Sequence, residues 1–260
     1  MKRKVINFLL IIYRLSTRIG LWRNQYFIAL FRFAYWQYKS ISDKNTIKFI
    51  NKYVNDGDYV IDVGAMVGFY THHLALNTGD LGRVYAFEPE KKNFEILVKS
   101  INKANLNHRA LLTNSAVSSS SGKVNLTINK SHPADHYISV NQDTNSQMAE
   151  SISLDEFIDN KDIGLIKFIK IDVQGHELEV LKGGNQAFKR DKPMILLEID
   201  YDTLDRSNNS PENLIQYLDS LNYKPHVINS DGTYIEISHD EIEVFMKKNG
   251  GFCDFLFISE

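Results

Sequence analysis

The stretch Val60-Ile-Asp-Val-Gly-Ala-Met-Val-Gly-Phe-Tyr-Thr71 decides the fold, because an apolar strand with an acid near its end leads into a Gly-x-x-x-Gly turn. Asp62 lies near the end of this predicted strand. Gly64 lets the backbone turn tightly and approach a ligand, and Gly68 permits close packing where a helix begins. The arrangement is typical of an α/β fold that binds a nucleoside cofactor at this turn.

A second acid follows at the distance that such a site requires. Glu88 ends the next apolar strand, Gly82-Arg-Val-Tyr-Ala-Phe-Glu88, where its carboxylate can accept hydrogen bonds from both hydroxyls of a ribose. The glycines do not follow the Gly-x-Gly-x-x-Gly spacing of dinucleotide sites, because Ala65 through Val67 separate the two glycines of the turn. The spacing therefore favours S-adenosylmethionine over NAD.

Alternating strand and helix patterns predict a mostly parallel sheet with helices on both faces. Seven strands are expected, at residues 59–63, 84–87, 110–113, 165–171, 194–199, 226–229 and 255–258. Ser210 and Pro211 are expected to cap and begin a later helix. Between residues 117 and 154 the pattern loosens into a hairpin insertion and a loop with His132, Asp135 and His136, which is either a connector or part of a substrate lid.

The composition limits the number of domains and the compartment. With 260 residues, of which 43% are hydrophobic and 12% aromatic, the chain can build one substantial core. We expect an N-terminal helical arm over residues 1–50 and one catalytic domain over residues 51–260. Cys253 is the only cysteine, so an internal disulfide and a cysteine zinc cage are excluded, and a reducing compartment such as the cytoplasm fits.

Basic residues concentrate in the N-terminal arm. Residues 1–42 carry eight Lys and Arg and no acid, which gives this segment a charge of +8 and the rest of the chain −10. The apolar run over residues 5–13 is shorter than the roughly 20 residues that span a bilayer, and no secretory cleavage site follows it. The arm is expected either to lie on an anionic membrane surface at the cytoplasmic face, or to pack on the domain or on a second subunit.

Short motifs occur in a defined order along the chain, beginning with the turn itself. They are Asp62-Val-Gly-Ala65 with Gly68, Ala86-Phe-Glu-Pro89, Ser115-Ala116, Ser153-Leu-Asp-Glu156, Lys170-Ile-Asp-Val-Gln-Gly-His-Glu177, Leu181-Lys-Gly183 and Leu196-Leu-Glu198. With these motifs the chain resembles the FkbM-family methyltransferases over roughly residues 58–200. The resemblance implies a Rossmann-like class I methyltransferase fold that uses S-adenosylmethionine, with methyl transfer to oxygen as the usual activity.

The resemblance and the turn together define a cofactor site, in which Glu88 binds the ribose. Its expected residues are Asp62, Gly64, Ala65, Gly68, Phe69, Glu88, Ser115 and Ala116, with the last two beside the adenine. Two positions depart from the family pattern: Met66 stands where the family commonly has Asn, and Gln174 where it commonly has Glu. The first should be tolerated because the backbone makes the turn, whereas the second removes an acid beside the expected reaction centre.

Methyl transfer from a sulfonium requires an acceptor oxygen in line with the methyl group, and a base or a metal to assist loss of the hydroxyl proton. Asp172 and Glu198 end neighbouring predicted strands at the edge where open α/β sheets bind ligands, and Asp200 follows closely. The two carboxylates could hold a divalent ion such as Mg²⁺. His176 could instead act as a metal-free general base, although a histidine at a helix start is also a common surface or capping residue. The expected catalytic residues are therefore Asp172, His176 and Glu198, with Asp172 and Glu198 as metal ligands.

Several functions remain open from the sequence. The glycine spacing argues against an NAD-dependent oxidoreductase, and no two prolines adjoin, which argues against the Asn/Asp-Pro-Pro-aromatic motif of nucleic-acid amino-methyltransferases. No nucleic-acid partner is expected. The basic, aromatic arm favours an acceptor hydroxyl on a saccharide or glycoconjugate, including a lipid-linked one. The alternatives are a non-sugar natural product as acceptor, and a catalytically inactive, membrane-associated adaptor that retains the cofactor.

Overall fold

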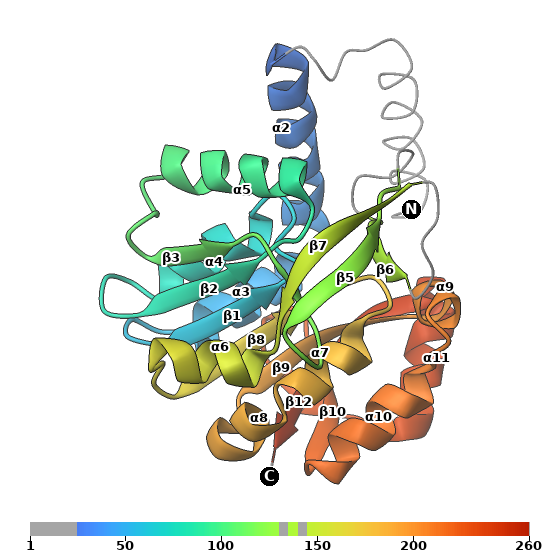
Figure 1. Ribbon diagram of the computed structural model, residues 1–260. Helices are drawn as coiled ribbons and strands as arrows, with labels where there is room; N and C mark the ends of the chain where they lie inside the picture. The colour runs from blue at the N-terminus through green and yellow to red at the C-terminus, as the bar shows by residue number, and fades with distance from the viewer. Residues whose placement is uncertain (1–24, 130–134, 140–144, 260) are drawn as a thin grey trace.

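The computed structural model describes residues 25–129, 135–139 and 145–259. Its centre is an eight-stranded sheet in the order β11-β10-β12-β9-β8-β1-β2-β3 (Figure 1). The parallel part consists of β1 (Tyr59–Val63), β2 (Arg83–Phe87), β3 (Ala110–Thr113), β8 (Ile166–Ile171) and β9 (Met194–Asp200). The remaining strands are β10 (Tyr223–Ile228), β11 (Tyr234–Glu236) and β12 (Phe252–Ser259), and β12 runs antiparallel to both of its neighbours.

All seven predicted strands lie in this sheet, and the prediction of a mostly parallel α/β fold is confirmed. The predicted strand count is wrong by one, because β11 adds an eighth strand at the edge. A tight turn joins β10 to β11, closed by the Asn229 amide donating to the Thr233 carbonyl at 2.7 Å. Three residues of strand are too short to show the alternation by which a strand is recognised.

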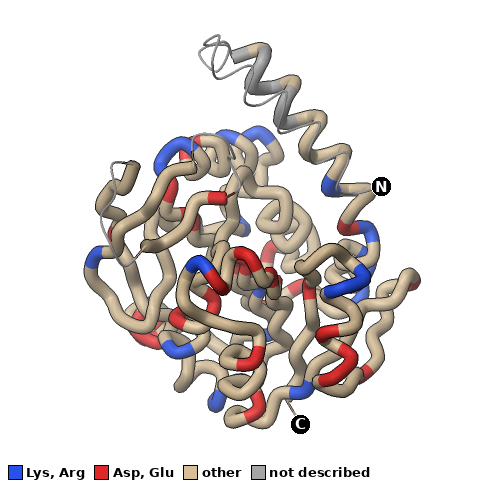
Figure 2. The backbone as a smooth tube through the Cα atoms, turned by 90° about the vertical axis from the view of Figure 1, so that its right-hand side faces the viewer, with Lys and Arg blue, Asp and Glu red and all other residues tan. Residues whose placement is uncertain are grey.

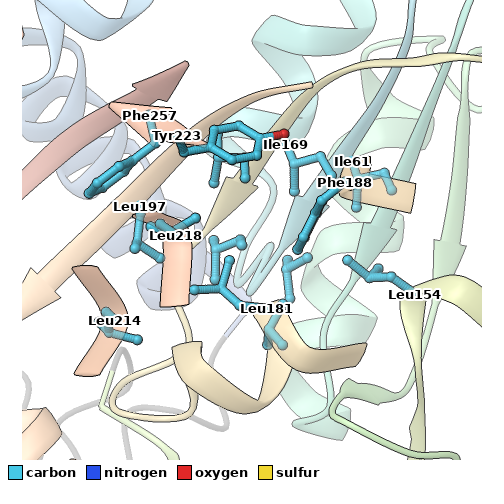
Figure 3. Close-up of a cluster of buried hydrophobic side chains, with 14 of the residues drawn as sticks. Ile61, Leu154, Ile169, Leu181, Phe188, Leu197, Leu214, Leu218, Tyr223 and Phe257 are labelled. Carbon is cyan, nitrogen blue, oxygen red and sulfur yellow. The ribbon is translucent and has the colours of Figure 1, made fainter. Parts of the chain in front are cut away.

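Helices cover both faces of the sheet, as predicted. The helices are α3 (Lys44–Tyr53), α4 (Phe69–Asn77) and α5 (Lys91–Lys103) on one face, and α6 (Leu154–Lys161), α7 (Glu177–Gly183), α8 (Asn185–Asp191), α10 (Pro211–Ser220) and α11 (His239–Asn249) on the other. Figure 3 shows the second face, where Leu181 and Phe188 lie near Ile169 and Leu197 of the sheet. Neighbouring strand residues are buried on both faces, as a doubly covered sheet requires.

Side chains cap the N-termini of two of the later helices. The predicted cap at Ser210 is confirmed, since its hydroxyl accepts from the amide of Asn213 and Pro211 is the first helical residue. Asp200 begins α9 (Tyr201–Arg206) in the same way, because its Oδ1 accepts from the amide of Asp202 at 2.8 Å. The end of β9 and the start of α9 are thereby fixed at the carboxyl edge of the sheet.

The predicted hairpin insertion is a small sheet of its own. Its strands are β4 (Ala116–Val117), β5 (Gly122–Thr127), β6 (Tyr137–Ser139) and β7 (Ser146–Ile152), in the order β4-β7-β5-β6. The antiparallel pair of β5 and β7 forms its centre. His132 lies outside the described residues, whereas Asp135 and His136 immediately precede β6.

Helix α2 (Gln25–Ser42) stands out from the body of the molecule, and Figure 2 shows few charged positions along it. Its C-terminal half packs on the domain, where the Trp36 ring contacts the Phe69 ring edge-on at 5.4 Å. Helix α3 spans the domain boundary predicted at residue 50, with Phe49 and Ile50 fully buried in the core. The apolar run over residues 5–13 and six of the eight basic residues of the arm lie outside the described residues. Within residues 25–129, 135–139 and 145–259, no helix has the length and apolar character needed to cross a bilayer.

Candidate active site

A cavity of about 650 Å³ opens at the carboxyl ends of β1, β8 and β9. Its walls are formed by the turn after β1, the first residues of β12, the C-terminal end of α2, and strand β6 of the insertion. Open α/β sheets bind their ligands at this edge. The cavity brings most of the predicted site residues together, and those that line it are Gly64, Ala65, Phe69, Glu88, Ser115, Ala116, Asp172, Glu198 and Asp200.

The glycines of the turn allow two close approaches. Gly64 has φ +82°, and a Cβ at this position would lie 1.9 Å from the carbonyl oxygen of Asp172. Gly68 has φ +91°, and a Cβ there would lie 2.8 Å from Cδ1 of Leu97 on α5. A side chain at Gly64 would therefore push β1 away from the backbone after β8, whereas at Gly68 the end of the Leu97 side chain could shift and the positive φ is the main reason for glycine. Gly68 begins α4, as the sequence predicts, although it does not itself line the cavity.

Glu88 joins the turn to the end of β2 through its carboxylate. Its Oε2 accepts from the amide of Met66 at 2.8 Å, and its Oε1 accepts from the amide of Glu90 at 2.9 Å. Met66 has φ +48°, a conformation in which Asn is better tolerated than most side chains, and it contributes its backbone rather than its side chain here. The substitution at Met66 is thus accommodated by the main chain.

The carboxylate of Glu88 is 6% exposed, and that exposed part faces the cavity. Burial raises its pKa to about 7, in spite of the two backbone donors that favour the charged form. The side chain of Asn93 is a third donor to this carboxylate, which has about four acceptor sites, so a ribose hydroxyl could donate to the remaining site. Such a donor would favour the charged form further.

Asp62 is fully buried and does not line the cavity. Its Oδ2 accepts a 2.6 Å hydrogen bond from the hydroxyl of Thr71, which ties β1 to α4 below the turn. Burial raises the pKa of Asp62, although the nearby Lys170 ammonium favours the charged form. The structure therefore places Asp62 beneath the turn, which it supports, and outside the cavity lining.

At the other end of the cavity, two carboxyl groups share one amide. The Nε2 of Gln174 lies 2.9 Å from both Asp172 Oδ1 and Glu198 Oε2. Lys170, which is 3% exposed, places its ammonium 3.0 Å from Asp172 Oδ2. The same ammonium lies 4.6 Å from the centre of the Tyr70 ring, a cation–π contact. Gln174 and Lys170 thus fix the orientation of Asp172.

The two carboxyl groups differ in charge. Burial acts to raise the pKa of Asp172, but the ammonium groups of Lys170 and Lys39 and a hydrogen bond from Glu198 outweigh it and hold that pKa well below its usual range. Burial and the negative charges of Asp172 and Asp254 raise the pKa of Glu198 well above its usual range. These opposite shifts favour the charged form of Asp172 and the protonated form of Glu198.

These residues do not fit the predicted divalent ion. The Lys170 ammonium and the Gln174 amide NH₂ face Asp172, and the same NH₂ faces Glu198, so the groups beside these carboxyls are hydrogen-bond donors rather than metal ligands. Across the described parts of the chain, no group of three or more His, Cys, Asp or Glu side chains is arranged to hold a metal.

His176 is not brought to the cavity. It lies at the N-terminus of α7, and its Nε2 is 2.9 Å from the hydroxyl of Ser118, which follows β4. Burial lowers the pKa of His176 to about 4. The geometry favours a structural contact between α7 and the insertion over a general base.

The sequence did not indicate the charged groups that reach the cavity from α2 and α3. Lys39 forms an ion pair with Asp43, and the hydroxyl of Tyr70 donates to Asp43 Oδ2 at 2.7 Å. Because Tyr70 also contacts Lys170, these residues connect the arm to the reaction end of the cavity. No motif links Lys39 to Asp43, so only the fold reveals their pairing.

Asp254 is a further carboxyl that the sequence analysis missed. It lies opposite Glu198 in the antiparallel pairing of β12 with β9, and it lines the cavity. Burial and the charge of Asp43 raise its pKa to about 6. The strand expected from the sequence begins at residue 255, one residue after Asp254. An acid within an apolar strand would have indicated a site residue, but Asp254 lies outside that expected strand.

The profile of the Methyltransferase FkbM domain family matches residues 62–225, which is more than half of the chain. Hexuronic acid methyltransferase AglP from Haloferax volcanii is 28% identical over 156 residues, which are 59% of this chain and 62% of that protein. The crystal structure of methyltransferase FkbM from Methylobacillus flagellatus KT has a TM-score of 0.50 at 19% identity, covers 78% of this chain and 44% of that one, and supports the fold. The chain therefore belongs to the FkbM methyltransferase family, and the prediction of an S-adenosylmethionine-dependent methyltransferase domain is confirmed.

Proposed function

We propose that this protein transfers a methyl group from S-adenosylmethionine to a hydroxyl group of a saccharide. The main support is that a single cavity is lined by Glu88 and the Gly64 turn and by the Asp172–Glu198 pair. The family supports methyl transfer. The similarity to a hexuronic acid methyltransferase supports a sugar acceptor.

The cofactor would lie across the turn after β1. Glu88 would accept hydrogen bonds from the ribose hydroxyls, while Ser115 and Ala116 would lie beside the adenine at the end of the cavity near β3. The methionine end would then extend over Gly64 toward Asp172, since the backbone of the turn contacts that residue. This placement directs the sulfonium methyl group to the reaction end.

The acceptor oxygen would attack the methyl carbon as the carbon–sulfur bond breaks and its electron pair passes to sulfur, which leaves S-adenosylhomocysteine. The hydroxyl becomes strongly acidic as its oxygen forms the new bond, so a weakly basic carboxylate can take its proton. Charged Asp172, oriented by Lys170 and Gln174, would accept this hydrogen bond and then the proton. Alignment of the oxygen with the methyl group would supply much of the remaining rate.

Aromatic side chains give the cavity walls suited to a sugar ring. Tyr35 and Tyr38 line it from α2, Tyr137 lines it from β6, and Phe252 lines it from β12. Flat rings can pack against the apolar faces of a pyranose, while the carboxyl groups accept from its hydroxyls. This combination of surfaces supports a saccharide over a wholly apolar acceptor.

A mass-spectrometric screen with labelled S-adenosylmethionine tests the proposal. The acceptors would be neutral sugars, hexuronic acids and amino sugars, free and as glycoconjugates, together with hydroxylated non-sugar compounds. Labelled methyl on a sugar oxygen is the expected result. Transfer to non-sugar compounds alone would contradict the saccharide acceptor, and cofactor binding without transfer to any of them would favour the non-catalytic adaptor.

A lipid-linked saccharide is the finer form of this proposal. The +8 charge of residues 1–42 supports it, as do Leu30 and Phe33 on α2, which are 64% and 62% exposed. Each basic residue near an anionic surface can contribute about 1 kcal/mol of attachment. Sedimentation with anionic and neutral vesicles at low and high salt tests it, using the full chain and a chain that begins at residue 25. That truncation keeps Tyr35 and Lys39 in the cavity wall, and equal sedimentation of both chains would contradict a membrane contact by residues 1–24.

A further inference from the structure

Strand β6 forms a wall of the cavity at the reaction end, where Tyr137 and Ile138 line it. The strand is the outermost of the insertion sheet and pairs with β5 over three residues. So few backbone hydrogen bonds hold an edge strand weakly. Side-chain contacts must therefore contribute to its position.

Arg206, the last residue of α9, supplies such contacts. Its Nη2 lies 2.8 Å from Asp135 Oδ1 and its Nη1 lies 3.4 Å from Asp135 Oδ2, so the guanidinium meets the carboxylate with two nitrogens. Its Cζ lies 3.9 Å from the centre of the Tyr137 ring. A planar guanidinium can stack on the ring while two of its nitrogens meet the carboxylate, a two-nitrogen fork that an ammonium lacks. Arg206 is 29% exposed and Asp135 is 22% exposed, so solvent screens this ion pair less than a fully exposed one.

The same guanidinium also reaches the turn beside the carboxyl pair. Its Nη2 lies 3.5 Å from the carbonyl oxygen of Gln174. The side chain of Gln174 in turn donates to Asp172 and Glu198. One side chain therefore contacts both the β6 wall and the turn that carries Gln174.

The other side of this wall is held by Asn129. Its Nδ2 donates to Asp135 Oδ2 at 2.8 Å, and its backbone amide donates to His136 Nδ1 at 3.1 Å. These bonds stay within the insertion, so they order the segment before β6 without tying it to the central domain. The contacts of Asp135 and Tyr137 with Arg206, in contrast, reach across to α9.

We propose that Arg206 is a positioning residue for methyl transfer, which holds β6 over the acceptor end of the cavity and couples it to the Gln174 turn. We call Arg206, Asp135 and Tyr137 the latch. The inference rests on the proposed function, because it assumes that the acceptor lies between β6 and the Asp172–Glu198 pair. The contacts of Arg206 are with Asp135, Tyr137 and the Gln174 turn, so its loss should affect the acceptor rather than the cofactor.

The matched variants are Arg206→Lys, which keeps the charge and loses the planar fork, and Arg190→Lys, an arginine paired with Asp191 outside the cavity wall. Three experiments are made: hydrogen exchange of residues 135–139, calorimetry for the affinity for S-adenosylhomocysteine, and steady-state kinetics for the KM and kcat of the best acceptor. Arg206→Lys should speed exchange at residues 135–139 and raise the acceptor KM roughly 10-fold, the loss expected when a partly shielded pair is broken. Its affinity for S-adenosylhomocysteine should not change, and Arg190→Lys should change none of the three.

A double variant separates the latch from a general loss of stability. If Arg206 acts through Asp135, adding Asp135→Asn to Arg206→Lys should raise KM little beyond either single change. Unchanged exchange at residues 135–139 would overturn the proposal, and so would faster exchange spread equally over β7 and β8. Exchange is read without turnover, so the latch can be confirmed or overturned even if no acceptor is methylated, an outcome that would count against the proposed function alone.

Discussion

The two ends of the cavity are built in different ways. The cofactor end consists of the Gly64 turn and Glu88, which lie within a short stretch of chain and meet largely through backbone contacts. The reaction end consists of side chains from α2, β6, β8, β9 and β12, which range from Tyr35 to Asp254. The cofactor end therefore depends on local conformation, and the reaction end depends on how the sheet, α2 and the insertion pack together.

The largest effect is expected where the two ends touch. Gly64→Ala would force a Cβ to within 1.9 Å of the Asp172 carbonyl and place alanine at φ +82°. Backbone strain costs about 1–3 kcal/mol and crowding adds a similar amount, so cofactor binding and turnover should both be lost. Denaturant unfolding and calorimetric titration with S-adenosylhomocysteine measure this.

Gly57→Ala is the matched control. Gly57 has φ +94°, but a Cβ added there would lie 4.0 Å from the nearest atom, Cβ of Leu81. It should show the cost of the backbone conformation without the clash. Equal losses in the two variants would mean that the contact between Gly64 and Asp172 does not join the two ends.

A smaller effect should be confined to the cofactor end. Glu88→Ala removes the expected acceptor of the ribose hydroxyls, and hydrogen bonds to a charged group contribute about 1.5–3 kcal/mol. The affinity for S-adenosylmethionine should fall by about 10- to 150-fold. Asp254→Asn, in the same cavity at the reaction end, should leave that affinity unchanged. A folded Glu88→Ala protein with normal affinity would remove Glu88 from the cofactor site.

The turn that carries Gln174 should make the stability of the fold depend on pH. Glu177 Oε1 accepts from the amides of Val173 and Gly175 on either side of Gln174, and burial raises the pKa of Glu177 from 4.5 to about 7. The folded protein therefore holds this proton more tightly than the unfolded chain. The resulting stability is fully present below pH 4.5 and is lost as pH rises through about 7.

Glu177→Gln keeps the neutral, hydrogen-bonding form at every pH. Urea unfolding at pH 5 and pH 8 should show a smaller loss of stability in this variant than in the parent protein. Glu236→Gln, at an exposed position of β11, is the control and should keep the parent slope. A parent-like slope in Glu177→Gln would show that this carboxyl does not titrate between the two states.

The smallest effect on catalysis is expected at His176. Its imidazole contacts Ser118 rather than the cavity, so His176→Ala should cost about 1 kcal/mol of stability for a lost hydrogen bond and leave turnover close to normal. Because its pKa is lowered to about 4, turnover should also show no inflection from this group near neutral pH. A fall of roughly 100-fold or more would restore His176 as the general base.

The same contrast explains what the sequence could predict. Gly64, Gly68 and Glu88 are separated by fixed short spacings that a backbone turn demands, and the seven expected strands follow from apolar patterns. Asp172 and Glu198 were also accessible, because each lies at the end of a strongly apolar strand. These features are local, so no knowledge of the pairing between distant segments was needed.

The missed features depend on distant pairing. Asp254 approaches Glu198 only because β12 inserts antiparallel beside β9. In the sequence Lys39 is one charge of a basic arm, although in the fold its helix turns it toward Asp43 at the cavity. Gln174 replaces an acid, but its amide donates to two carboxyl groups, which only the register of β8 with β9 brings together.

Asp172→Asn separates the two ends of the cavity, because it removes one charge at the reaction end and changes nothing at Glu88. Calorimetry with S-adenosylhomocysteine should give an unchanged affinity, while single-turnover transfer of labelled methyl should slow by about 10²- to 10⁴-fold. Normal transfer by a folded Asp172→Asn protein would contradict the assignment of Asp172 to the acceptor hydroxyl. Loss of cofactor affinity together with transfer would contradict the separation of the cavity into two ends.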